Sequence, residues 1–510
     1  MASNLSRPLN PHIKLVPFAS TETFETLLGE LKQWRKNNGK RGWGKLEPEV
    51  LRVIKLITLD LFAAWLSSSE LLVGYSRNAK EFTKSGRYWD DKSGQKLFTE
   101  KVFLSVIDGL AALNFLDDKR AKQGTIGQSS RIKATQMLID VMKDNGITWA
   151  ALDASPDPSS LIELKSKKDK QGNKTKLPYD DSVDARIPEM REALVRINER
   201  LQGTLINLNV TDEELKAINR RLANDKDREM IDFTKRYLVR KFTDNSFDSG
   251  GRYYGGWFQQ VPKEYRTGII INDTLTVEWD FKTLHPTILY LKSGLTPPED
   301  SYDLTGWDKK HRDNLYKKVF NQVLNSSPGT RKKTQWYKLA PDLLKKPLPP
   351  GWDDLSRAKK SKLNREEFLR LTGRDYDELI EAIILKHRPI EHHLFSKSWS
   401  WLQKLDSDIA EKVMLDMLEN KNEVILPLHD SFIIRMGSEK YLYSSMQKAF
   451  RELLGKDPII DANLAPLRDG DVKSQVASVM EQIKNYQKTH SGFNQRNTEW
   501  VQVWGLNGRD

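Results

Sequence analysis

Apolar residues recur at helical spacing in the first part of the chain. Between Glu22 and about Ser69, residues such as Leu51, Ile54, Ile57 and Leu61 lie three or four positions apart. This spacing places side chains on one face of a helix. The segment is therefore predicted to be rich in α-helix, and it follows an irregular arm over residues 1–20 that contains three prolines.

A different pattern follows over residues 103–135. It predicts a helix, a short strand, a glycine-containing hairpin tip and a returning strand. This order resembles a winged helix, and basic residues occupy the predicted wing: Lys119, Arg120, Lys122, Arg131 and Lys133. Such side chains reach phosphates or a minor groove in DNA-binding wings. A solvated hairpin in a domain that contacts only protein is the alternative, and the pattern does not separate the two.

The next segment changes to charged residues. Residues 165–176 contain six lysines against one aspartate, which is typical of a mobile surface loop. Two helices are predicted after it, one from about Pro188 to Leu201 and one that begins at the cap signature of Thr211. Residues 247–262 then place four glycines around Arg252, which indicates either a backbone that closely approaches another group or a plain glycine-rich turn.

Two apolar runs of β type are each interrupted by one aspartate. They are Val277-Glu-Trp-Asp-Phe-Lys-Thr-Leu-His-Pro-Thr-Ile-Leu-Tyr290 and Val424-Ile-Leu-Pro-Leu-His-Asp-Ser-Phe-Ile-Ile434. A carboxylate within a buried strand is costly unless a cation lies against it. Asp280 and Asp430 are therefore candidates for a shared Mg²⁺ or Mn²⁺ site, which indicates phosphoryl transfer by a two-metal route. In the alternative, each aspartate merely ends a strand or caps a turn.

A basic helical face is predicted between the two runs. Within residues 308–326, the spacing places Lys317, Asn321 and Asn325 on one face of a helix, with Arg312 before it. A lysine followed by amides suits a triphosphate at one end and a base or sugar at the other. A solvated basic face is the alternative. Residues 330–350 are predicted to loop, and helices are predicted from about Arg365, over 397–419 and over 439–454.

Composition narrows the classes of partner. The chain has 510 residues, 30% of them charged, and a formal net charge of +12, which favours a polyanionic partner. The absence of cysteine excludes disulfides, thiolate zinc sites and a cysteine nucleophile. No apolar run approaches the roughly 18 residues that span a bilayer, so we expect a soluble protein in the cytoplasm without a membrane partner.

Five blocks in order resemble the right-handed palm polymerases. Asp280-Phe-Lys-Thr-Leu-His-Pro-Thr-Ile-Leu resembles motif A of family A and family B DNA polymerases. Leu428-His-Asp-Ser-Phe432 resembles motif C of family A, and most closely that of the single-subunit phage RNA polymerases. Three further blocks are similar to segments of family A or of the single-subunit phage RNA polymerases. They are Gly251-Arg252 with Gln259 and Arg266, Arg196-Ile-Asn-Glu-Arg-Leu201, and Gln403 to Asp408. The resemblance covers roughly residues 190–435. The predicted fingers helix lacks the aromatic-glycine pair of family A and is closer to the Lys-x-x-x-Asn of family B.

The resemblance implies an α+β fold. It predicts a right-hand polymerase with an antiparallel palm sheet, helical fingers and thumb-like helices, preceded by an α-rich, winged-helix-like domain. The expected division is a nucleic-acid-binding domain over residues 1–155, a basic linker with thumb-like helices over 156–245, and a catalytic palm and fingers over 246–510.

The resemblance also implies a template-directed nucleotidyltransferase, with a DNA polymerase preferred. Asp280 and Asp430 would hold two Mg²⁺ or Mn²⁺ ions, and the partners would be a DNA primer-template and nucleoside triphosphates. The nucleotide would be bound by Arg312, Lys317, Lys318, Asn321 and His285. The nucleic acid would be contacted by Arg252, Gln259, Arg266, Gln403 and His429, together with Arg131 and Lys133 of the wing.

Two alternatives stay open. One is an RNA polymerase or primase of the same fold, favoured by the motif C and Arg-Ile-Asn blocks. His285 lies five residues after Asp280, where a bulky side chain collides with a ribose 2′-hydroxyl in the DNA polymerases, and this favours deoxynucleotides. The other alternative is a non-catalytic DNA-binding protein of replication or regulation, although the intact aspartate pair argues against it. The sequence does not predict the oligomeric state.

Overall fold

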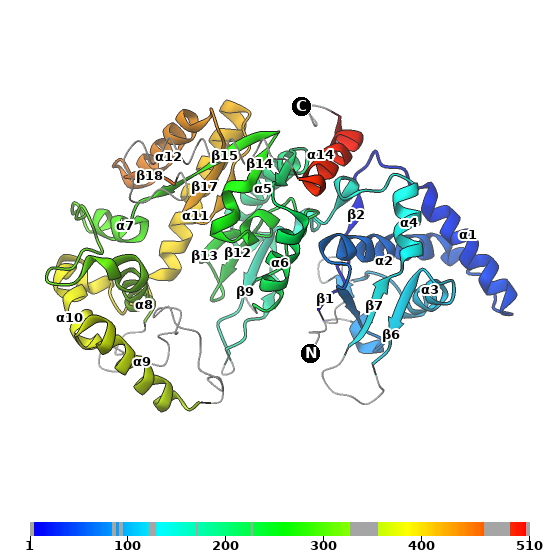
Figure 1. Ribbon diagram of the computed structural model, residues 1–510, viewed down its shortest axis with the longest axis horizontal. Coiled ribbons are helices and arrows are strands. Elements are labelled where there is room, and N and C mark those ends of the chain that lie inside the picture. Colours follow the sequence, from blue (N-terminus) through cyan, green and yellow to red (C-terminus); the bar gives the residue numbers. More distant parts are fainter. Residues whose placement is uncertain are drawn as a thin grey trace.

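The computed structural model describes residues 5–83, 88–90, 95–121, 129–169, 172–225, 228–326, 355–463 and 490–505. Helices and mostly antiparallel sheets both contribute to it, so the fold is α+β. Two hydrophobic cores are present, one formed by residues between Leu9 and Leu152 and the other by residues between Trp149 and Trp500. Figure 1 shows them as two masses side by side.

The first core is covered by helices where the apolar spacing predicts them. The helices are α1 (Glu22–Asn37), α2 (Glu47–Ser67), α3 (Glu100–Ala112) and α4 (Gln136–Asp144). One sheet has the strand order β1 (Ser6–Pro8), β3 (Leu72–Tyr75), β7 (Ser130–Ala134) and β6 (Leu116–Lys119). Two short pairs complete this half: β2 (Lys14–Leu15) with β8 (Leu152–Asp153), and β4 (Trp89–Asp90) with β5 (Gln95–Lys96).

The basic hairpin of this half is β6 and β7. Its predicted tip, including Lys122, lies outside the described residues. Arg131 and Lys133 lie on β7 itself, and the Lys133 ammonium is 3.3 Å from Glu70. Arg120 forms ion pairs with Asp108 and Asp118. Part of the positive charge of the hairpin is therefore neutralised within the protein, and its contact with DNA stays a prediction.

In its described residues the lysine-rich segment is a surface loop, as we predicted, and only Lys165 and Lys176 at its two ends belong to strands. Its ends form an antiparallel hairpin, β9 (Ile162–Lys165) with β10 (Lys176–Leu177), and β9 continues the sheet through β12 (Val239–Thr243) to β13 (Ser246–Tyr254). The Lys174 ammonium donates to the hydroxyl of Thr243 and to Asp244. Lys174 of this segment thus has acceptors within the protein.

Glycines bring β13 against helix α11 (Trp399–Lys421). Gly250 and Gly251 have φ values of 79° and 83°, a region that side chains disfavour. A Cβ atom on Gly251 would lie 2.9 Å from the Phe242 ring and 3.0 Å from the Ser407 hydroxyl. The glycine-rich segment therefore marks a close backbone approach, one of its two predicted meanings. The preceding helices α5 (Arg186–Gln202) and α6 (Asp212–Ala223) lie where we predicted them.

A larger sheet forms the floor of the second half. Its strand order is β11 (Ile206–Leu208), β14 (Ile269–Ile271), β15 (Thr274–Phe281), β17 (Ser431–Arg435) and β16 (Leu426–Leu428), and β18 (Ile460–Asn463) pairs with β15. The remaining helices are α7 (Leu284–Lys292), α8 (Lys317–Asn325), α9 (Arg357–Thr372), α10 (Tyr376–Lys386) and α12 (Glu439–Leu454). Helix α9 begins before the predicted start at Arg365, and the predicted loop over 330–350 lies outside the described residues.

Helix α14 (Ser491–Trp504) lies where the two cores meet (Figure 1). The buried guanidinium of Arg236 lies 5.0 and 4.9 Å from the ring centroids of Trp149 and Trp500, and these two centroids are 5.7 Å apart. Burial lowers the pKa of Arg236 to about 9. The Trp149 indole donates to the Arg496 carbonyl, and the Trp504 indole donates to the Ala150 carbonyl. Helix α14 therefore contacts the segment around Trp149. In this segment the residues of the first core end and those of the second core begin.

His387 makes stability depend on pH. Its ring is buried, Nε2–H donates to the Ser301 carbonyl, and Nδ1 accepts from the Tyr290 hydroxyl. Burial lowers its pKa from 6.5 to about 4. The unfolded chain therefore binds the proton more readily, and stability falls as the pH drops from about 6.5 towards 4. We expect this histidine to cost about 2 kcal/mol of unfolding free energy between pH 7 and pH 5.

Urea unfolding of the wild type and of His387→Gln at both pH values measures this contribution. The variant should show a smaller loss of stability on acidification, whereas exposed His392→Gln should behave as the wild type does. An equal loss in wild type and His387→Gln would contradict the assignment.

Candidate functional site

A cavity of 940 Å³ lies over one end of the large sheet. Its floor is formed by the end of β15 and the β16–β17 turn, and helices α7, α8 and α11 supply its walls. Both candidate metal ligands, Asp280 and Asp430, line it. Most of the other predicted nucleotide-binding residues line it too, as described below.

The two aspartates come together through strand pairing. Asp280 is the penultimate residue of β15 and pairs with Ser431 of β17, and the Phe281 N–H donates to the Asp430 carbonyl over 3.2 Å. The prediction that Asp430 interrupts a strand is wrong. The run from 424 to 434 is a hairpin with His429 and Asp430 as its turn, and His429 has a φ of 70°. The turn places Asp430 at the end of β17, beside Asp280.

A third carboxylate, Asp461, escaped the sequence reasoning. It lies on β18, pairs with Asp280 in register and lines the same cavity. The signal was a short run, Pro458-Ile-Ile-Asp461, in which an aspartate again ends an apolar stretch. Its shortness hid it, because two apolar residues do not define a strand.

The donor set suits a hard cation that also binds phosphate. Within the described ranges, no group of three or more histidine, aspartate or glutamate side chains is arranged to hold a metal ion. Mg²⁺ does not require such a group, because it keeps several waters and binds through one or two carboxylates together with substrate phosphates. Asp280 and Asp430 fit that description.

Helix α8 forms the basic wall of the cavity. Lys317, Asn321 and Asn325 all line it, as the predicted helical face requires. Lys318 is exposed and does not line the cavity, so Lys317 is the lysine that faces it. A π-helical turn over Arg312–Tyr316 precedes α8, and such turns are frequent at functional sites.

Arg312 is held by acidic neighbours. Its guanidinium contacts Asp300 at 2.6 and 2.9 Å and also contacts Asp313. Burial opposes the ionisation of Asp300, but the hydrogen bonds from Arg312 and from the backbone lower its pKa below the usual value. The Tyr302 ring lies beneath both Arg312 and Lys317, at 5.6 and 5.8 Å. A phosphate that binds Arg312 must therefore compete with an ionised carboxylate.

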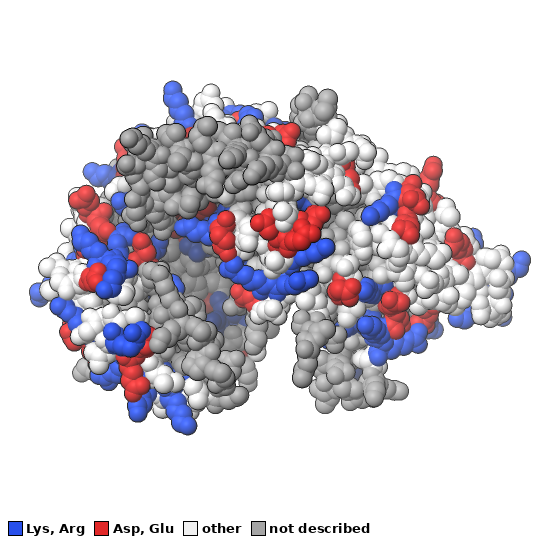
Figure 2. Space-filling model, in the orientation of Figure 1, with Lys and Arg blue, Asp and Glu red and all other residues white. Residues whose placement is uncertain are grey.

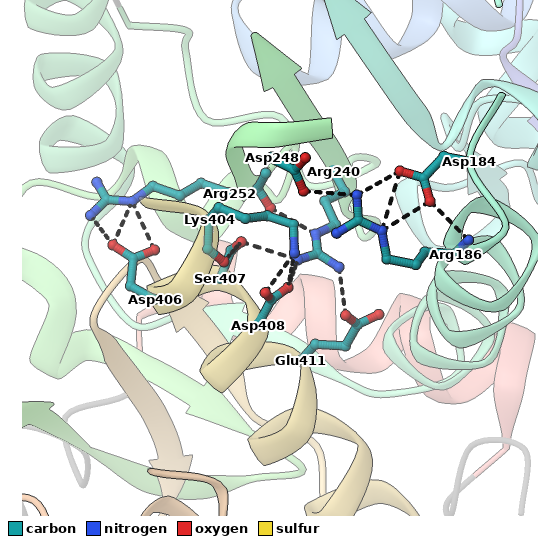
Figure 3. A network of polar contacts seen from close by, with 11 residues as sticks. Asp184, Arg186, Arg240, Asp248, Arg252, Lys404, Asp406, Ser407, Asp408 and Glu411 are labelled. Atoms are coloured by element: carbon teal, nitrogen blue, oxygen red, sulfur yellow. Dashed lines mark hydrogen bonds and ion pairs between the residues drawn. The ribbon is translucent and has the colours of Figure 1, made fainter. Parts of the chain in front are cut away.

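Asp406 connects two residues that line the cavity. Its side chain is 1% exposed on α11, and it accepts hydrogen bonds from Arg252 of β13 and from His285 Nε2, the latter at 2.9 Å. Figure 3 shows the Arg252 contact. Burial opposes the ionisation of Asp406, but His285 and Arg252 lower its pKa below the usual value. Because an ionised carboxylate only accepts hydrogen bonds, Nε2 of His285 carries a proton.

A second buried arginine fixes α11 on the sheet. Arg240 of β12 is fully buried and bonds to Asp408, Glu411 and the Ser407 hydroxyl (Figure 3). Lys404 also bonds to Asp408. The helix that carries Asp406 is therefore held to the strands by ion pairs of Asp406, Asp408 and Glu411. The sequence reasoning noted the block from Gln403 to Asp408 but selected only Gln403, which lines the cavity.

Three predicted nucleic-acid contacts face the protein itself. The Gln259 amide donates to the carbonyls of Tyr253 and Pro427, and Arg266 contacts Glu278 at 3.2 Å. His429 is outside the cavity lining, and its ring meets Tyr254 at 5.4 Å. Burial lowers the pKa of His429 to about 4, so its ring is neutral at pH 7. Contact of these residues with nucleic acid stays a prediction.

Comparison with known proteins adds little. No family model and no curated protein matches the chain. A solved structure of the POL domain of Pol1 from M. smegmatis, in complex with DNA primer-template and dNTP, matches with 12% identity and a TM-score of 0.22. The match covers 58% of this chain and 57% of that one. We base no argument on a similarity of this size.

The surface carries both signs of charge. Figure 2 shows lysine and arginine side chains interspersed with aspartate and glutamate over the described part of one face. Among the described residues, no helix combines the length and apolar character needed to cross a membrane.

Proposed function

We propose that the chain is a template-directed nucleotidyltransferase, most specifically a DNA polymerase that extends a primer 3′-hydroxyl and releases pyrophosphate. One observation carries the proposal. Asp280 at the end of β15 and Asp430 in the turn before β17 lie side by side at the floor of a cavity whose wall presents Lys317, Asn321 and Asn325. Paired carboxylates facing a lysine-led helix suit a substrate that brings both a divalent cation and a triphosphate.

The place of each residue in the cavity indicates its role in the reaction. When Mg²⁺ is bound, it supplies activation of the attacking hydroxyl and neutralisation of phosphate charge, and Asp280 and Asp430 would hold it. Lys317 neutralises negative charge on the phosphates. Arg312 joins it by exchanging Asp300 for a phosphate oxygen. Arg252 and His285, fixed by Asp406, bound the cavity beside the aspartates.

Extension of a labelled primer on a DNA template with Mg²⁺ tests the proposal. Parallel reactions contain dNTPs, NTPs, or dNTPs without primer. Extension with dNTPs alone supports the DNA polymerase. Use of NTPs or synthesis without primer supports an RNA polymerase or primase instead, which the Leu428-His-Asp-Ser-Phe432 block favours. Inactivity in every reaction supports a DNA-binding protein without catalysis.

His285 provides a prediction about the sugar. Its imidazole lines the cavity and is fixed by a 2.9 Å hydrogen bond to Asp406. We expect His285→Ala to raise the incorporation of NTPs relative to dNTPs by about 10-fold or more, since a lost steric contact is worth about 1–3 kcal/mol. The ratio of kcat/KM for the two nucleotides measures it, and exposed His392→Ala is the control. An unchanged ratio would remove His285 from sugar selection.

A further inference from the structure

The cavity has two chemically different ends. Helix α8 rises about 12 Å from Lys317 to Asn325. Beside Lys317 lie Arg312 and the Tyr302 ring, so this end is cationic. Beyond Asn321, the lining residues on and facing α8 are amide, apolar or aromatic side chains: Leu324, Asn325, Trp399 and Gln403. A nucleoside triphosphate has the same polarity, with its phosphates at one end and its base at the other.

Trp399 is fixed at the second end. The backbone N–H groups of Phe395 and Lys397 donate to the carbonyls of Val323 and Ser326, which fastens the chain before α11 to the end of α8. Trp399 is the first residue of α11, two positions later. These bonds place the start of α11 beside the end of α8 that carries Asn325, and Trp399 and Asn325 both line the cavity.

The indole ring is supported and partly exposed. The Lys174 ammonium lies 5.6 Å from its centroid and is itself held by Thr243 and Asp244. Three aromatic residues of the described chain line the cavity, and two of them, Phe281 and Tyr302, are only 4% exposed. Among the described phenylalanine, tyrosine and tryptophan residues of the lining, Trp399 is thus the one whose ring has surface available to a ligand.

We propose that Trp399 stacks against the base of the bound nucleoside triphosphate. This inference rests on the proposed function for the nucleotide but adds a residue and a contact to it. Bases stack on aromatic side chains through their π-faces regardless of identity. Asn325, and Gln403 one turn after Trp399 on α11, also line the cavity, and their amides are able to contact the base edge. Trp399 also supplies an accessible aromatic ring, whereas the aromatic residue of α8 itself, Phe320, is buried.

Equilibrium binding without primer tests the contact directly. Calorimetry with Mg²⁺ compares dATP with inorganic tripolyphosphate, which has the phosphates but no base. Trp399→Ala should weaken dATP binding about 5- to 100-fold and leave tripolyphosphate binding unchanged. Trp399→Phe should retain most of the affinity, because it keeps a ring. Tyr441→Ala removes an exposed ring on α12, outside the cavity lining, and should change neither ligand.

Two results would overturn the inference. One is wild-type affinity for dATP in Trp399→Ala, including the case in which only primer-template binding weakens. The other is an equal loss for dATP and tripolyphosphate, which would indicate a general disturbance of the cavity. Failure of the proposed function is distinguishable from failure of this inference. A chain that binds dATP through Trp399 but extends no primer would contradict the polymerase assignment and leave the stacking contact supported.

Discussion

Asp280→Asn and Asp430→Asn are each expected to lower the rate of primer extension by on the order of a thousandfold or more. The reason is that the carboxylate pair, by holding the metal ions, contributes several kcal/mol of transition-state stabilisation. An asparagine keeps the shape of the side chain but removes the charge that holds a divalent cation. Neither side chain is needed for the backbone pairing of β15 with β17. Binding of a primer-template duplex should therefore be nearly unchanged. Extension assays and fluorescence anisotropy with the same duplex measure the two properties.

A matched control comes from the same half of the chain. Asp457→Asn removes an exposed carboxylate that pairs with Arg451 and lies outside the cavity lining, and it should extend primers as the wild type does. If both Asp280→Asn and Asp430→Asn extend primers at the wild-type rate, the proposed metal site is wrong. If duplex binding disappears with activity, the aspartates act in folding rather than in the reaction.

Asp406→Ala is expected to lower the free energy of unfolding by about 3–5 kcal/mol, because it leaves the mostly buried Arg252 without its partner. His285 loses its hydrogen bond in the same variant. Both residues line the cavity, so activity should fall together with stability. Urea unfolding and primer extension of the same preparation measure the two losses.

A double variant separates packing from function. Arg252→Met combined with Asp406→Leu replaces the ion pair with apolar side chains, a change that is often neutral or stabilising for buried pairs. We expect stability to return towards that of the wild type while extension stays impaired. Recovery of both properties would show that the pair serves the fold alone. A single Asp406→Ala variant with wild-type stability would contradict the assigned burial cost.

The sequence predicted elements well where the pattern was long. Helix α12 has the predicted bounds, and α6 begins at Thr211 with the predicted cap, in which Thr211 and Glu214 bond reciprocally. The lysine-rich loop was predicted from its composition, but the strands β9 and β10 at its ends were missed, because composition describes how a segment is solvated, whereas strand pairing depends on what lies next to it. Asp430 was assigned to a strand because a two-residue turn without glycine interrupts the apolar run only weakly.

The residues of the site likewise fall into those that the sequence predicted and those that it did not. Asp280, Lys317, Asn321 and Asn325 were found because each belongs to a periodic element that repeats its own spacing. Asp406 and Asp461 were not selected, because their importance comes from contacts with residues more than 100 positions away. A single sequence does not show which residues contact each other across such distances in the chain. The same limit applies to Gln259, whose amide donates to the Pro427 carbonyl 168 positions away, but not to Arg266, whose partner Glu278 is 12 positions away.

Helix α14 has a consequence for how the protein is made. Arg236 and Trp149 lie in the chain long before residues 491–504, which supply Trp500 and Trp504 to the same cluster. During translation the apolar surface around Arg236 therefore stays open until the last of these residues leaves the ribosome. A ribosome stalled before this point would hold a nascent chain whose two halves are not yet fastened together, and this chain should be a preferred target for chaperones and proteases.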